Sequence, residues 1–215
     1  MTKLRVCFIG DSITNGTGDS AMLGWPGYLC AEEVAAGHDM TDYNLGIRGD
    51  TSDEIRRRWQ AEVSARLPKA LNCAIVFNFG LNDATLQGEG QDGKIRVALG
   101  SSIRNAREML AAAKAMHPTL WVGPGAVDDT RMPLLTEEGN IRDKRNARTA
   151  DYNLAFRALA DELGVPYLDM LSQTINDTAW PSMLSDGLHP AAAGHRRMAA
   201  IVGQWPAWRR LLDGA

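Results

Sequence analysis

The 215-residue sequence predicts an α/β fold, a three-layer sandwich in which helices cover both faces of a parallel sheet. Two observations indicate this class. Five apolar segments with the composition of buried strands alternate with segments of helical periodicity. Glycine or polar residues follow several of these strands, at the edge where parallel sheets bind their ligands. No repeat or linker interrupts the chain, so we expect one domain over residues 1–215.

The composition is that of a globular protein, and it argues against several classes of function. Hydrophobic residues make up 45% of the chain and charged residues 23%. The formal net charge of -3 predicts no general affinity for nucleic acid or acidic membranes. No apolar run approaches the roughly 20 residues of a membrane-spanning helix. The first apolar run has six residues, too few for the core of a signal peptide.

Cysteine usage indicates a cytoplasmic protein. Cys7, Cys30 and Cys73 are odd in number and form no C-x-x-C pair, so neither a disulfide framework nor a zinc site is predicted. Cys7 and Cys73 lie in or beside predicted strands, where we expect them to pack in the core.

The first predicted strand, residues 4–9, leads directly into a polar turn. Its sequence LRVCFI is rich in residues that favour strands, and Gly10, Asp11 and Ser12 follow it. A serine at the carboxyl end of a parallel strand is a candidate nucleophile. The alternative interpretation is that Ser12 caps a helix, which is a common role for serine.

The next segments predict a helix, a strand and a second helix. Residues 28–36 form the first helix, with Pro26 in its first turn and Gly37 near its end. Residues 43–45 end the second strand. Residues 51–54 (TSDE) have the spacing of a capping box. They open a helix that Pro68 ends and whose apolar stripe is Ile55, Trp59, Val63 and Leu67.

The middle of the chain adds two strands, one helix and a long connection. The third strand, residues 74–79, is followed by a polar, glycine-rich loop at residues 87–93. An amphipathic helix begins near Ile95 and ends before Pro118, and residues 120–123 are the fourth strand. Residues 128–148 have no clean period, and a connection of this length is more often functional than inert. They carry the basic residues Arg131, Arg142, Lys144, Arg145 and Arg148.

The last third predicts a helix, the fifth strand and a final helix. The helix, with an apolar stripe over residues 152–163, is terminated by Gly164 and Pro166. Residues 165–170 are the fifth strand. The final helix runs from about residue 191 to about residue 211.

Polar residues that follow these strands, or lie in the last loop, complement one another chemically. Acyl transfer needs a nucleophile, a base, a group that orients the base, and donors for the developing oxyanion. Ser12 supplies a hydroxyl, and His189 can supply the base, because histidine is the side-chain type most often used for this role. Asp186, three residues before His189, can orient the imidazole. Asn82 and the backbone N–H groups of Ser12 and Gly46 are candidate donors, and Gly46 would let the backbone approach the substrate closely.

Four sequence blocks appear in a fixed order that resembles the GDSL-type, or SGNH, hydrolase superfamily. The four defining residues of that superfamily fall on Ser12, Gly46, Asn82 and His189. Ile13 stands where the family name has leucine, a volume-conserving change. The blocks are residues 10–14 (GDSIT), 44–52 (NLGIRGDTS), 80–83 (GLND) and 186–190 (DGLHP).

The resemblance implies both a fold and a set of residue roles. It implies a flavodoxin-like sheet of five parallel strands in the order 2-1-3-4-5. Ser12 would be the nucleophile, His189 its base and Asp186 the partner of His189. The N–H groups of Ser12 and Gly46 and the amide of Asn82 would form the oxyanion hole. No cofactor and no metal are implied.

Several residues have a structural interpretation beside a functional one. Asp169, at the end of the fifth strand, is an alternative partner for His189. Asp11 and Asp83 are expected to brace loops. Trp25 either lines an acyl pocket or lies in the core or at its rim. Surface or packing roles are expected for His38, His117 and His195. The run Arg56, Arg57 and Arg58 is expected to form the solvated face of its helix.

The hypothesis we favour is a serine esterase that acts on small esters or thioesters through an acyl-enzyme. The alternatives are a carbohydrate O-deacetylase with the same machinery and a non-catalytic binding protein of this fold. Nucleotide binding is disfavoured because the glycine signatures are absent. Residues 128–148 are expected on the same sheet edge as Ser12, either as a lid that meets an acyl chain and an anionic group or as an oligomer contact or solvated flap. Oligomeric state is not predicted.

Overall fold

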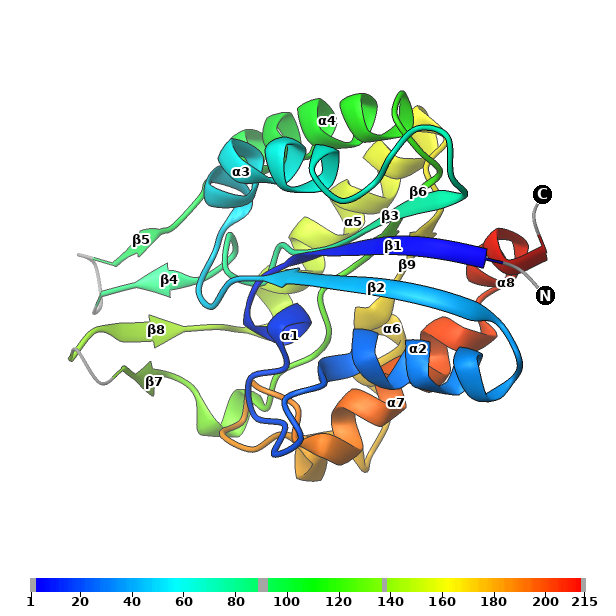
Figure 1. Ribbon diagram of the computed structural model, residues 1–215. Coiled ribbons are helices and arrows are strands. Elements are labelled where there is room, and N and C mark those ends of the chain that lie inside the picture. Colours follow the sequence, from blue (N-terminus) through cyan, green and yellow to red (C-terminus); the bar gives the residue numbers. More distant parts are fainter. Residues whose placement is uncertain (1–2, 89–92, 137–138, 214–215) are drawn as a thin grey trace.

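The computed structural model describes residues 3–88, 93–136 and 139–213. Its main sheet has five parallel strands in the order β2-β1-β3-β6-β9 (Figure 1). Counted along the chain within this sheet, that order is 2-1-3-4-5, as predicted. The strands are β1 (Lys3–Gly10), β2 (Asp39–Gly46), β3 (Cys73–Asn78), β6 (Thr119–Val122) and β9 (Tyr167–Leu168).

Helices cover both faces of the sheet, and each face has its own hydrophobic core (Figure 1). Val6 and Phe8 of β1 belong to one core, and Cys7 and Ile9 belong to the other. Successive side chains of a strand point to opposite faces, so β1 is buried on both sides. The first core is closed by α2 (Gly24–Ala35), α7 (Ala192–Gln204) and α8 (Pro206–Asp213), and the second by α3 (Ser52–Ser64), α4 (Leu99–Lys114) and α5 (Asn146–Leu163).

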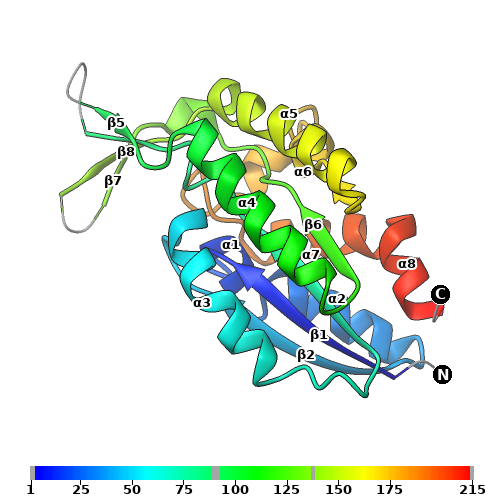
Figure 2. The same cartoon turned by 90° about the horizontal axis from the view of Figure 1, so that it is seen from above.

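A second sheet, which the sequence did not predict, projects beyond the carboxyl ends of β1 and β2 (Figures 1 and 2). It is antiparallel, with the order β5-β4-β8-β7. Two of its strands flank the polar loop expected at residues 87–93, part of which lies outside the described residues, and two come from residues 128–148. The strands are β4 (Leu86–Gln87), β5 (Lys94–Ile95), β7 (Leu134–Leu135) and β8 (Ile141–Asp143), and the short helix η2 (Asp129–Arg131) precedes β7.

The predicted helices α3 and α5 are confirmed, and the starts of two others differ. In α3 the Thr51 N–H donates to the Glu54 carboxylate at 2.8 Å, as the predicted capping box requires. The helix expected near Ile95 begins at Leu99, because Ile95 pairs with Leu86 in the second sheet. Helix α2 begins at Gly24, four residues before its predicted start.

Two elements near the carboxyl terminus are shorter than predicted. The fifth strand, expected over residues 165–170, is β9 alone, because the Asp169 side chain accepts the Ser172 N–H and opens α6 (Met170–Thr174). The final helix is broken after Gln204, since Pro206 has no N–H to continue it. A short helix, η3 (Trp180–Met183), precedes the last loop. None of the helices in the described residues combines the length and the apolar character needed to span a membrane.

Candidate active site

Three central strands end side by side, and their ends place the candidate site. Gly10, the last residue of β1, is in register with Gly46 of β2 and with Asn78 of β3. A side chain at Gly10 would collide with the Thr14 side chain and the Asn78 carbonyl oxygen. The glycine of the Gly-Asp-Ser turn is therefore required by the packing of the turn against β3.

Ser12 opens a one-turn helix at this edge but does not cap it. The helix is α1 (Ser12–Asn15), and its N-cap is Asp11, whose Oδ1 accepts the Ile13 N–H at 2.9 Å. The capping interpretation of Ser12 is thus wrong by one residue. Ser12 is 6% exposed, and its hydroxyl is directed at a histidine from the other end of the chain.

Ser12, His189 and Asp186 form a continuous hydrogen-bonded chain. His189 Nε2 lies 3.0 Å from Ser12 Oγ, across 177 residues of sequence. His189 Nδ1 lies 2.7 Å from Asp186 Oδ2. A carboxylate can only accept, so Nδ1 carries the hydrogen and Nε2 presents its lone pair to the Ser12 hydroxyl. This arrangement lets the imidazole take a proton from Ser12.

Asp186 is held ionised by the turn in which it lies. Its Oδ1 accepts the N–H groups of Leu188 and His189, at 2.9 and 2.7 Å. Partial burial disfavours the charged carboxylate, but the hydrogen bonds from His189 and Leu188 outweigh this and keep the pKa of Asp186 well below its usual range. The group that orients His189 therefore stays charged at neutral pH.

Asp169 does not lie at His189, so the alternative partner is excluded on geometry. Its two carboxylate oxygens accept hydrogen bonds from Asn153 at 2.9 Å and from Arg157 at 2.8 Å, and both also receive donors of Ser172. Asp169 thus joins α5 to the start of α6. The structure brings only Asp186 of the two candidates to the imidazole.

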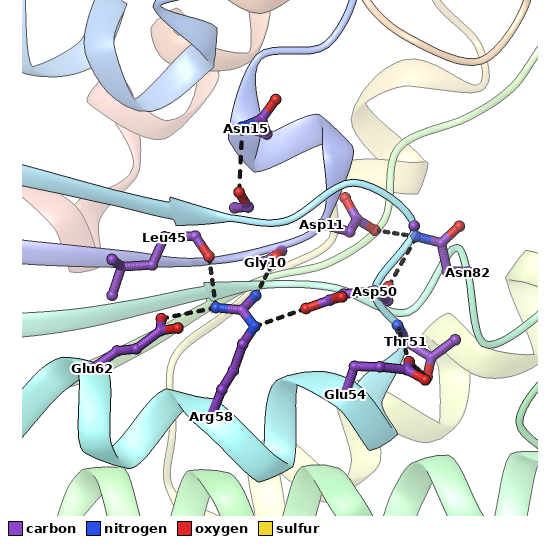
Figure 3. A network of polar contacts seen from close by, with 12 residues as sticks. Gly10, Asp11, Asn15, Leu45, Asp50, Thr51, Glu54, Arg58, Glu62 and Asn82 are labelled. Atoms are coloured by element: carbon purple, nitrogen blue, oxygen red, sulfur yellow. Dashed lines mark hydrogen bonds and ion pairs between the residues drawn. The ribbon is translucent and has the colours of Figure 1, made fainter.

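The Asn82 side chain is fixed by three polar contacts. Its amide nitrogen donates to Asp11 Oδ2 at 3.2 Å and to the Asp50 carbonyl at 2.9 Å (Figure 3). Its oxygen accepts the ammonium group of Lys144 at 2.8 Å. Because an ammonium group offers hydrogens only, this contact sets which end of the amide faces Asp11. The nitrogen end therefore faces the turn that carries Ser12.

Lys144 is a site residue whose position the sequence did not reveal. It is 3% exposed, and its Nζ also donates to Thr85 Oγ1 at 2.7 Å. Burial lowers the pKa of Lys144, and the carboxylate of Asp11 acts in the opposite direction. In the sequence, Lys144 is one of several basic residues in the segment 128–148, and nothing distinguishes it from the others. Lys144 directly follows β8, which pairs with β4. No local sequence pattern predicts this pairing.

Gly46 has a packing role that differs from the one predicted. A side chain there would collide with the backbone of α1, at Asn15 N and Asp11 O. Gly46 thus allows a close approach between β2 and α1. The Gly46 N–H donates to Asn44 Oδ1 at 3.0 Å. A substrate oxygen bound there would have to share or replace this contact.

Arg58 contradicts the expectation that the Arg56, Arg57 and Arg58 run is simply solvated. Its guanidinium donates to the carbonyls of Gly10 and Leu45, both at 2.9 Å (Figure 3). It also donates to Asp50 Oδ2 at 2.7 Å and to Glu62 at 2.9 Å. Arg58 thereby ties the ends of β1 and β2 to the loop whose Asp50 carbonyl holds Asn82.

Two further residues prove to be part of the core. Trp25 is fully buried, and its indole N–H donates to Asn78 Oδ1 at 3.2 Å, so it does not line an acyl pocket. His195 is fully buried, and its Nδ1 accepts the Trp25 N–H at 3.1 Å, which is a packing role. Across residues 3–88, 93–136 and 139–213, no three His, Cys, Asp or Glu side chains are grouped to hold a metal ion.

A cavity of about 510 Å³ opens above the candidate site. Ser12, Asn82 and His189 line it, and so do residues of the segment 128–148. The wall residues from this segment are Leu134, Leu135, Thr136, Arg142 and Lys144.

Comparison with known proteins agrees with this architecture. A sequence model of the GDSL-like Lipase/Acylhydrolase family matches residues 8–197. The isoamyl acetate-hydrolyzing esterase of Saccharomyces cerevisiae is 31% identical over 164 residues, which are 70% of this chain and 62% of the yeast protein. The acetylxylan esterase of Geobacillus stearothermophilus is 25% identical over 211 residues, 91% of this chain and 90% of that enzyme.

Solved structures show the same fold at low sequence identity. The lipase/acylhydrolase from Enterococcus faecalis superposes with a TM-score of 0.77 at 21% identity, covering 97% of each chain. A structure described as TesA superposes with a TM-score of 0.71 at 23% identity, covering 97% of this chain and 99% of that one.

Proposed function

Because this chain belongs to the GDSL-like lipase/acylhydrolase family, we propose that it is a serine esterase with Ser12 as nucleophile. The observation that carries the proposal is the 3.0 Å contact between Ser12 Oγ and His189 Nε2, backed by the 2.7 Å contact to Asp186. This geometry is the one that activates a serine hydroxyl.

The reaction proceeds in two halves. In the first, His189 takes the Ser12 proton while Oγ attacks the ester carbonyl carbon, and a tetrahedral oxyanion forms. The intermediate collapses with breakage of the bond to the alkoxy oxygen, which receives the proton from His189 and leaves as the alcohol. In the second half, His189 takes a proton from water, the hydroxide attacks the acyl-enzyme, and the acid leaves as Ser12 recovers its proton. Asp186 stabilises the imidazolium in both halves.

The oxyanion would be bound by the N–H groups of Ser12 and Gly46 and by the Asn82 amide. Asn82 supports this assignment because its amide nitrogen faces Asp11, in the turn that holds Ser12. The contact to Asp11 Oδ2 is the longer of its two, at 3.2 Å against 2.9 Å. A negatively charged oxygen would accept this hydrogen in place of Asp11.

A carbohydrate O-deacetylase is the second candidate, and one observation favours it. The acetylxylan esterase relative aligns over 91% of this chain, which is more than the 70% aligned with the yeast esterase. Both functions use the same acyl chemistry and differ in the alcohol. A non-catalytic binding protein would not need the hydrogen-bonded chain from Ser12 to Asp186.

Substrate profiling tests the proposal and separates the two candidates. The assay compares p-nitrophenyl esters of graded acyl length, acyl-CoAs and acetylated xylo-oligosaccharides at equal concentration. We expect the p-nitrophenyl esters to be hydrolysed, with an optimum at short acyl chains. A much higher kcat/KM for the acetylated sugar would identify a deacetylase. Failure to hydrolyse any of these substrates, with Ser12 unreactive, would favour a binding protein.

We also propose that the protein acts in the cytoplasm on a small-molecule ester and without a cofactor. Its cysteines are free thiols buried in the fold, which suits a reducing compartment: Cys7, Cys30 and Cys73. Cell fractionation with an antibody to the protein would check the location.

A further inference from the structure

Two arginines line the cavity beside Ser12 and take no part in the mechanism above. Arg48 follows β2, and Arg142 lies in β8. Within the described part of the chain, neither side chain makes a hydrogen bond or an ion pair. Their basic neighbours are engaged: Arg145 and Arg148 both pair with Asp143, at 2.6 and 3.2 Å. The two cavity arginines therefore have their charges available for a ligand.

The strand geometry directs Arg142 into the cavity. Side chains of directly paired residues on neighbouring strands share a face of the sheet, and Arg142 of β8 is paired with Leu134 of β7. Leu134, the partner of Arg142 across β7, lines the same cavity. Arg142 Nε is buried and has no hydrogen-bond partner among the residues that the structure describes. A buried, unpaired guanidinium N–H is costly, which favours a ligand that accepts from it.

The surroundings of Arg142 are electropositive. The pKa of Arg96 is lowered by burial and, to a smaller extent, by the charge of Arg142. Among the described residues, Arg96 Nη1 is also buried without a hydrogen-bond partner. Arg96 donates through Nη2 to the carbonyl of Gly49, next to Arg48. Among the described residues that line the cavity, Asp186 is the acid, and it is already bound to His189.

We propose that Arg48 and Arg142 form a subsite for a carboxylate or phosphate group carried by the ester substrate. The inference rests on the proposed esterase function and narrows its substrate class to anionic esters. Planar guanidinium groups bind such oxyanions through paired, charge-assisted hydrogen bonds. Leu134 and Leu135 would contact the apolar part of the same substrate.

The test compares anionic esters with neutral esters of similar size. On the acyl side, mono-p-nitrophenyl glutarate is compared with p-nitrophenyl pentanoate. On the alcohol side, 3-acetoxybenzoate and 3-acetoxyphenyl phosphate are each compared with methyl 3-acetoxybenzoate. The enzyme variants are Arg48→Gln, Arg142→Gln and the double variant. The control variant is Arg57→Gln, which removes one positive charge from an exposed position of α3 outside the cavity.

We expect the wild type to prefer at least one anionic ester over its neutral counterpart. Arg142→Gln should lower that ratio of kcat/KM values roughly tenfold, as loss of a charge-assisted hydrogen bond predicts. The double variant should bring the ratio near one, and Arg57→Gln should leave it unchanged. The glutarate, benzoate and phosphate arms show which anion, on which side of the ester, is bound.

Two results would overturn the subsite. One is a wild type that hydrolyses all neutral and anionic esters without preference. The other is a double variant that is folded, by its thermal transition, and keeps the wild-type ratio. Absence of turnover for every ester, together with no reaction of Ser12 with a fluorophosphonate, would instead overturn the proposed esterase function itself.

Discussion

The ammonium group of Lys144 donates a 2.8 Å hydrogen bond to the side-chain oxygen of Asn82, a residue 62 positions earlier in the chain. The bond joins the residue that directly follows β8, a strand of the second sheet, to the loop after β3. It also sets the orientation of the Asn82 amide, whose nitrogen faces Asp11. An element outside the main sheet thus orients a group that we assign to the oxyanion hole.

We predict that Lys144→Met lowers kcat by between about tenfold and 10²-fold with little change in KM. The upper figure is the low end of what loss of an oxyanion donor costs, and the methionine side chain would leave Asn82 bound to Asp11 and Asp50 but without the contact that holds its oxygen. The free energy of unfolding should fall by roughly 1–3 kcal/mol, because Asn82 and Thr85 lose a buried donor. Steady-state kinetics and urea unfolding measure the two effects.

The matched control for Lys144 is Lys94→Met, at an exposed lysine of β5 in the same sheet. It should leave both quantities near wild type. If Lys144→Met raised KM alone, Lys144 would contact substrate and would not position Asn82.

We predict that Asn82→Ala lowers kcat by roughly 10²–10³-fold, because its amide is assigned to an oxyanion that exists only after the attack. KM for a p-nitrophenyl ester should stay within a few-fold of wild type. Circular dichroism must show an unchanged fold. A change confined to KM would make Asn82 a substrate-binding residue and require a different oxyanion hole.

We predict that His189→Ala abolishes turnover, whereas Asp186→Asn retains a measurable remnant. Without the imidazole, no base contacts Ser12. Without the carboxylate the ring remains but loses its orientation and tautomer, a loss of up to roughly 10⁴-fold in kcat. Asp169→Asn is the comparison, since Asp169 contacts Arg157 and Ser172 instead of His189. Equal activity of Asp186→Asn and wild type would contradict this division of roles.

We predict that Arg58→Met lowers the free energy of unfolding by roughly 1–3 kcal/mol, because the partly buried carbonyls at Gly10 and Leu45 lose their charged donor. Arg57→Met, at an exposed neighbour on the same helix, should change it by no more than about 0.5 kcal/mol. Equal effects of the two changes in urea unfolding would show that Arg58 contributes only as a surface charge.

The main sheet could be predicted because its signals are local. The apolar run over residues 4–9 is long enough to indicate a strand buried on both faces, and the Thr51–Glu54 spacing indicates a helix start. The chain order of Ser12, Asn82 and His189 in their motifs was sufficient to nominate them. The structure brings Ser12 and His189 into contact and orients Asn82 toward the Ser12 turn.

The second sheet could not be predicted, because its strands have two or three residues and its two hairpins are joined by the pairing of β4 with β8, which are far apart in the sequence. A strand of two residues shows no periodicity. For the same reason, the sequence shows that Lys144 and Arg142 are basic, but it does not show that only Lys144 of the two bonds to Asn82. The role of Arg58 could not be read from a run of three arginines, since three of its four acceptors come from β1, β2 and the loop at Asp50.

The most direct test of the central claim is the site of covalent labelling by a fluorophosphonate, located by tandem mass spectrometry of the digested protein. We predict a single adduct on Ser12 that forms at a rate matching the loss of esterase activity, and that is absent from Ser12→Ala and slowed in His189→Ala. An adduct on another serine, or a Ser12→Ala variant that still hydrolyses esters at the wild-type rate, would contradict the assignment of Ser12 as the nucleophile.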